Sequence, residues 1–106
     1  MSGFKKRKQD AENLFKHDQE IEFKSMARRN KLLGLWAAEQ MGITGDAADE
    51  YAKEVVVSDF DRPGDDDVLE KVLADFTDKG VGVSSSMLRK EMDRLLDVAR
   101  AQVKSE

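Results

Sequence analysis

Residues 19–41 read QEIEFKSMARRNKLLGLWAAEQM, and this stretch is the strongest indication of the fold. Leu32 and Trp36 widen its apolar face, and Gly42 is suited to ending a helix there. Gly34 lowers the stability of a helix by about 1 kcal/mol relative to alanine. Because it has no side chain, we expect it to permit close approach of a neighbouring helix. The apolar face itself recurs at steps of three and four residues, as on one side of an α-helix: Phe23, Met26, Ala27, Leu33, Ala37 and Met41.

Three further amphipathic segments follow toward the C-terminus. The second helix is predicted to begin at a Thr44 cap. The third is predicted to have Pro63 in its first turn, carries three aspartates at its positively polarised end and stops at Gly80 and Gly82. The fourth follows a Ser84 cap and keeps helical spacing of its apolar side chains almost to the C-terminus.

No segment shows the sustained alternation of apolar and polar residues that is typical of strands. The only β-branched run, residues 55–57, lies within a helical pattern. Short connections between helices favour antiparallel neighbours. The sequence therefore predicts an all-α protein in which residues 19–106 form a four-helix bundle.

Residues 1–18 differ from the rest in their low apolar content. After Met1 their only large apolar side chains are Phe4, Leu14 and Phe15. This segment buries too little surface to offset its ordering entropy, so we expect it to be mobile in the free protein. Its composition tolerates helix, so we also expect it to become helical against a partner.

The charge of the chain is unevenly distributed. Charged residues make up 38% of the 106 residues, and the net charge is −4. Residues 1–31 hold nine basic and five acidic side chains, whereas residues 32–106 are strongly acidic. This asymmetry is expected either of a solvated helical surface or of a protein that binds a charged partner surface.

Several classes of protein are disfavoured by the sequence. No apolar run reaches the length of about 18 residues that a transmembrane helix needs, and no apolar run follows the basic N-terminus as in a secretory signal. The absence of cysteine excludes disulfides and thiolate chemistry. We therefore expect a soluble protein without direct membrane insertion.

No constellation of residues indicates catalysis or a metal site. His17, the only histidine, adjoins Asp18, but adjacent residues on a helix point about 100° apart and are poorly placed to act together. Residues 65–67 are three aspartates without the spacing of a calcium loop, and residues 84–86 are serines without a neighbouring base. The glycines form no phosphate-binding loop. We predict a protein that acts by binding and is not an enzyme.

Two basic groups are candidate contact sites. Residues 5–8, KKRK, have the charge to bind nucleic acid or an acidic membrane surface, but the acidic remainder of the chain disfavours polyanions. We predict no nucleic-acid binding. Arg28, Arg29 and Lys31 form the second group, for which a solvated helix face and docking to an acidic protein surface are both open.

Several sequence strings resemble the zeta subunit of the alphaproteobacterial F1-ATPase. The most specific is residues 27–34, ARRNKLLG, with WAA following at 36–38. The resemblance runs from about Phe4 to Lys71 and is weaker in the last helix. Further matching pieces are Phe15, His17-Asp18, Phe23-Lys24, Met41-Gly42, Thr44-Gly45, Tyr51-Ala52, Val55-Val56, Ser58-Asp59-Phe60, Pro63-Gly64 and Asp67-Val68.

The resemblance implies a four-helix bundle with a mobile inhibitory segment, residues 1–18. It implies that this segment orders as a helix at a catalytic interface between alpha and beta subunits and blocks rotation in the ATP-hydrolysing direction. The implied partners are the alpha, beta and gamma subunits of F1-ATPase. The implied location is the cytoplasm, peripheral to the inner membrane through F1. This chain carries Lys5 and Lys6 where the family commonly has acidic residues.

No cofactor is predicted, and weak binding of adenine nucleotide is left open as an alternative regulatory function. We expect the free protein to be a monomer. Apolar anchors and basic side chains of the segment and of the first helix are the predicted contacts with the partner: Phe4, Arg7, Lys8, Leu14, Phe15, His17, Asp18, Phe23, Arg28, Arg29 and Lys31.

Overall fold

The computed structural model describes the backbone of residues 2–61 and 65–106 and the side chains of residues 17–59 and 65–106. This part of the chain forms four helices, α1 (Ser2–Gln40), α2 (Asp46–Asp61), α3 (Asp65–Lys79) and α4 (Ser85–Ser105). The predicted all-α, four-helix fold is confirmed. Pro63, predicted to start the third helix, lies outside the described residues, as does the side chain of Phe60.

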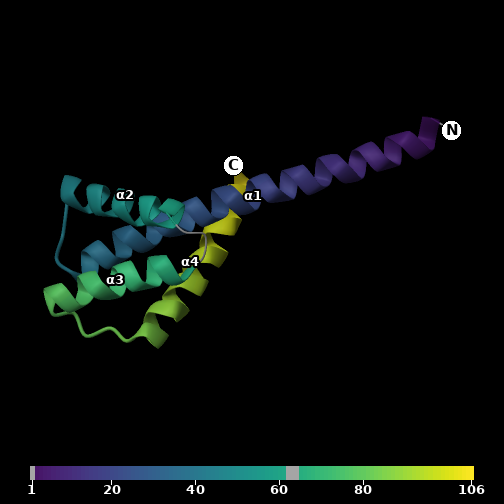
Figure 1. Ribbon diagram of the computed structural model, residues 1–106. Helices are drawn as coiled ribbons and strands as arrows, with labels where there is room; N and C mark the ends of the chain where they lie inside the picture. Colours follow the sequence, from purple (N-terminus) through teal and green to yellow (C-terminus); the bar gives the residue numbers. More distant parts are fainter. Residues whose placement is uncertain (1, 62–64) are drawn as a thin grey trace.

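Helix α1 is much longer than the other three and gives the molecule its shape. Its C-terminal half lies among α2, α3 and α4, whereas its N-terminal half extends away from them (Figure 1). The molecule is 65 Å long but only 25 × 23 Å across. The C-terminus lies beside the middle of α1, so α4 ends close to where the projecting part begins.

The first helix begins earlier than the sequence pattern placed it. We predicted a start near residue 19, whereas α1 runs without interruption from Ser2. Helix-tolerant residues fill this stretch, and no proline occurs in it. The mobility of residues 1–18 in the free protein, and their separation from the bundle as a unit, stay predictions.

The core is formed where the apolar faces of the four helices meet. Trp36 of α1 packs edge-on against Phe76 of α3, with ring centroids 5.8 Å apart. Burial of such side chains, rather than helix propensity, supplies most of the stability of short helices. The buried members of the core cluster are Leu33, Ala37, Ala38, Tyr51, Val55, Val68, Leu69, Val72, Phe76, Leu88, Met92 and Leu95.

Gly34 sits at the closest crossing of α1 and α2. A Cβ atom built on Gly34 would lie 2.5 Å from the Cα of Ala52 and 3.3 Å from a Val55 methyl group. Only a residue without a side chain allows the two backbones to approach this closely. The predicted role of Gly34 is confirmed.

Local sequence signals identified most of the helix ends correctly. Gly42 has φ +74°, its N–H donates to Glu39, and the Ile43 N–H donates to the Ala38 carbonyl at 2.8 Å, which completes a Schellman motif. The end of α3 has the same arrangement around Gly80.

The two predicted N-caps have different outcomes. Ser84 caps α4 as predicted, because its hydroxyl accepts from the Met87 N–H. The second helix starts at Asp46, one residue later than a cap at Thr44 predicts. The first backbone bonds of α2 are accepted by the Gly45 carbonyl, and Gly45 has φ +64°, so it takes the cap position instead.

Candidate functional site

The part of α1 that leaves the bundle is the candidate functional site, together with its base. Described side chains in it begin at His17, and both His17 and Asp18 are exposed. Phe23 is 66% exposed, although its spacing placed it on the apolar stripe of the helix. The stripe of α1 therefore enters the core only further along the chain, and Phe23 presents an aromatic ring to solvent.

Ion pairs fasten the base of this helix to the last turns of α4. Arg100 donates through Nη2 and Nε to the two carboxylate oxygens of Glu22, at 2.7 and 3.2 Å. The hydrogen bond from Arg100 holds the pKa of the Glu22 carboxyl below its usual range, and the same bond raises the pKa of Arg100. Arg28 donates to Gln102 at 3.0 Å and pairs with Glu106. These contacts hold residues 22–28 of α1 against α4.

Arg29 is directed into the bundle rather than toward solvent. Its side chain is 1% exposed, Nε donates to the Asn30 amide oxygen at 2.8 Å, and Nη2 donates to Asp65 at 2.8 Å. A guanidinium removed from water needs such partners, because an uncompensated buried charge costs several kcal/mol. Arg29 thereby joins α1 to the first turn of α3, where Asp65 also meets the positive end of the helix dipole.

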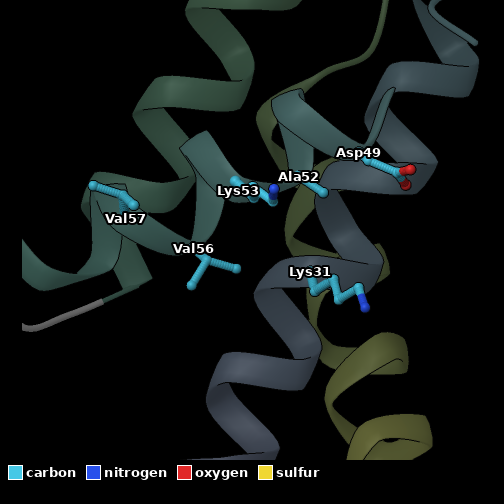
Figure 2. A pocket seen from close by; sticks show the side chains of 6 residues that line it. All are labelled: Lys31, Asp49, Ala52, Lys53, Val56 and Val57. Carbon is cyan, nitrogen blue, oxygen red and sulfur yellow. The ribbon is translucent and has the colours of Figure 1, made fainter. Parts of the chain in front are cut away.

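A surface groove runs between α1 and α2 on the side of Phe23. One hollow, of about 600 Å³, is lined by side chains of α2 and by Lys31 of α1. Figure 2 shows these side chains, with Asp49, Ala52, Lys53, Val56 and Val57 along α2. A second hollow, of about 360 Å³, shares Lys31 and Val56 with the first and continues to Phe23 and Lys24.

The opposite side of α2 is tied to α3 by a polar cluster. The Tyr51 hydroxyl donates to Asp75 at 2.7 Å, and the Lys71 ammonium lies 3.2 Å from Asp75 and 3.4 Å from Glu54. The Lys71 ammonium also lies over the Tyr51 ring, 5.4 Å from its centroid. Burial, followed by the hydrogen bond to Asp75, raises the pKa of Tyr51 well above its usual range. This cluster is satisfied internally and joins two helices.

The predicted contact residues have different surroundings in the structure. Lys31 is exposed and borders the groove, as does Phe23, whereas Arg28 is partly buried and engaged with α4. Arg29 is engaged inside the bundle, and a role for it in partner binding stays a prediction. The side chains of Phe4, Arg7, Lys8, Leu14 and Phe15 lie outside the described residues.

Sequence reasoning missed the α2 side of the groove. Val57 is 56% exposed and Lys53 is exposed, but the helical pattern predicted only which residues of this segment are buried. The available signal was the run of three valines at 55–57, since three successive residues cannot all face one side of a helix.

Neither a metal-holding cluster nor a membrane-spanning helix occurs among the described residues. Across residues 17–59 and 65–106, no group of three or more histidine or acidic side chains is arranged to hold a metal ion. No helix in the part of the chain that the structure describes is both long and apolar enough to cross a membrane. What the site offers is a projecting helix, an aromatic ring and a groove, which are features for contact with another protein.

Comparison with known proteins agrees with the sequence resemblance. A family model described as ATPase inhibitor subunit zeta matches residues 1–102. A solved structure, described as a solution NMR structure, is 45% identical and superposes with a TM-score of 0.71 over 80% of this chain and 96% of that chain. Comparison with curated proteins finds no match. Because the family model covers nearly the whole sequence, the chain belongs to the ATPase inhibitor subunit zeta family.

Proposed function

We propose that this protein inhibits ATP hydrolysis by F1-ATPase by inserting the N-terminal part of α1 into a catalytic interface between alpha and beta subunits. The observation that carries the proposal is the family match together with the extension of α1 away from the bundle (Figure 1). The protein acts by binding rather than by catalysis. It functions in the cytoplasm, at the membrane only through F1, and is a monomer when free.

The shape of the molecule supports insertion of one helix and exclusion of the rest. A single α-helix with its side chains is about 10–12 Å in diameter, whereas the molecule is 25 × 23 Å across its two short axes. An interface that admits the helix therefore excludes the bundle. The bundle remains outside as a stop, while the inserted helix blocks the movement of the gamma subunit relative to alpha and beta.

Continuity of α1 makes this stop effective. The helix runs from Ser2 to Gln40 without a break, so the inserted part and the bundle are joined by helix rather than by a flexible linker. Glu22 and Arg28 pair with α4 at the point where the helix leaves the bundle. A force on the inserted part is thus transmitted to the bundle instead of being lost in a hinge.

Deletion of residues 1–18 tests the mechanism. The cluster of buried core residues starts at Leu33, so the truncated protein is expected to keep its folded bundle and the helicity of α2, α3 and α4. It is expected to lose inhibition of F1 hydrolysis, measured at saturating inhibitor, with circular dichroism as the control for folding. Inhibition equal to that of the full chain contradicts insertion as the mechanism.

Weak binding of adenine nucleotide is a second proposal, with less support. The hollow in Figure 2 is lined by two lysines, Lys31 and Lys53, and by aliphatic side chains of α2, a combination that suits a phosphate beside an apolar base. Titration with ADP, followed by amide chemical shifts, tests it. Shifts confined to the groove support binding, and no shifts at millimolar ADP end the proposal.

A further inference from the structure

Three exposed large apolar side chains occur among the described residues, and two of them border the same groove. Phe23 is 66% exposed and lines one hollow of the groove between α1 and α2, and Val57 is 56% exposed and lines the other. Ala27 and Val56 line the groove between them. Exposed aromatic and aliphatic side chains that share one concave surface are typical of a protein contact site rather than of a solvated face.

The charge at this groove is opposite to that of the molecule. Lys24, Lys31 and Lys53 line it and form no ion pair with any described residue, whereas Asp49 and Asp59 are the carboxylates at its borders. Glu106 also reaches the groove but is paired with Arg28. The chain as a whole carries −4, so a positive, partly apolar groove is a local exception. A partner surface with carboxylates and an apolar hollow complements it.

The position of the groove along α1 identifies where that partner surface lies. Phe23 follows Asp18 by five residues, which is about 7.5 Å along a helix. If a partner protein encloses α1 up to residue 18, the rim of that partner therefore lies next to the Phe23 end of the groove. The groove is continuous with the insertion interface, and Lys24 and Lys31, two turns apart, lie on one face of the same helix.

We propose that the groove between α1 and α2, from Phe23 to Val57, docks the bundle onto an acidic and partly apolar surface at the rim of the alpha/beta interface of F1-ATPase. This inference rests on the proposed function. Docking holds the bundle against the head once the helix has entered. The groove contributes affinity, while residues 1–18 produce the inhibition.

Full-length variants and intact F1 test the proposal. One variant carries Phe23→Ser with Val57→Ser, and a second carries Lys24→Glu with Lys31→Glu. Met87→Ser and Lys90→Glu on α4 are the matched controls, since Met87 is 59% exposed and Lys90 is exposed, yet neither lines the groove. Kd for F1 and maximal inhibition of hydrolysis are measured on the same samples, at low and high salt.

The apolar variant is expected to raise Kd about tenfold or more, as loss of an aromatic contact at a protein interface does, with maximal inhibition unchanged. The lysine variant is expected to raise Kd mainly at low salt, because salt screens exposed charges. The controls are expected to stay within about twofold of the unaltered protein, as surface residues outside a contact do. Groove variants that bind F1 as tightly as the controls overturn the docking surface and leave the insertion mechanism intact.

The remaining outcomes separate the two proposals. Tight binding that depends on the groove, without inhibition by the unaltered protein, supports the docking surface and overturns the inhibitory mechanism. No binding of the unaltered protein to F1 overturns both. Sedimentation of the free protein tests whether a second copy of the chain occupies the groove instead. If the unaltered protein is a dimer, and the apolar variant is a monomer with the same Kd for F1, the groove is a dimer interface and the proposal is overturned.

Discussion

The two halves of α1 have the same secondary structure but different surroundings. None of the side chains from His17 to Lys24 is buried, whereas Leu33, Ala37 and Ala38 are completely buried within the bundle. Because isolated helices are marginal in water, tertiary packing stabilises the C-terminal half. Within residues 17–24 the described ion pair is that of Glu22 with Arg100, near the end of α4. One helix thus combines a part stabilised by its own protein with a part available to a partner.

The largest difference between the halves is expected for truncation of apolar side chains. Leu33→Ala leaves a cavity in the core and is expected to lower the free energy of unfolding by about 2–5 kcal/mol. Phe23→Ala removes a larger side chain from the exposed half and is expected to change it by no more than about 0.5 kcal/mol. Urea denaturation followed by circular dichroism measures both. Equal losses would mean that Phe23 is part of the core.

The close crossing of α1 and α2 gives the next effect. Gly34→Ala places a methyl group against the Ala52 backbone and is expected to cost about 1–3 kcal/mol, in spite of the better helix propensity of alanine. Gly82→Ala is the control, because a Cβ there meets nothing within 4 Å. Thermal unfolding of the two variants separates the packing clash at Gly34 from the general effect of replacing a glycine by alanine. A stabilised Gly34→Ala protein would show that the helices separate at little cost.

The buried guanidinium of α1 gives an effect of similar size. Asp65→Asn leaves Arg29 without its carboxylate and is expected to cost about 1–3 kcal/mol, since a buried charge then loses its partner. Asp66→Asn is a matched control in the same helical turn, because its partner Arg89 is exposed. We expect that control to cost less than about 1 kcal/mol. Identical denaturation midpoints for the two variants would contradict a structural role for Arg29.

The smallest effect is expected at the base of the projecting helix. The pKa of Glu22 is lowered by Arg100, so this pair stabilises the fold above the carboxyl's ordinary pKa, and the contribution is lost as pH falls through the lowered value. Glu22→Gln is expected to cost about 0.2–1 kcal/mol at pH 7 and low salt. The difference from the unaltered protein should vanish once the pH is below the lowered pKa of Glu22. Glu20→Gln, for which the described residues provide no ion pair, should show no such pH dependence.

Features that depend on neighbours in the chain could be predicted from the sequence. Gly42, Gly80 and Ser84 act through hydrogen bonds to residues within five positions, so their roles are visible in the local pattern. Thr44 shows the limit of this reasoning, since both it and Gly45 are acceptable caps and the choice depends on the turn geometry. The family was also evident from the sequence, because residues 27–38 form a specific string.

Features that depend on distant residues could not be predicted. Arg29 was expected on a contact surface, but Asp65 lies 36 positions away and only the folded chain brings the two together. The helical pattern placed Val55 and Val56 on the buried face, but it did not indicate that Val56 and the exposed Val57 line a hollow together with Lys31 of α1. The groove is formed by two helices, so its lining cannot be read from either one.

By itself the sequence determined the helical class, the ends of α1 and α3 at glycines, the capped start of α4, the family and the contrast between a polar N-terminal segment and an amphipathic remainder. Periodicity, capping and turn conformation depend on residues close together in the chain, so they can be predicted from the sequence alone. Only the tertiary structure decided that Phe23 faces solvent, that Arg29 faces inward and that α4 fastens the base of α1. The rotation of each helix about its axis is set by the packing of all four together, and no single helix contains that information.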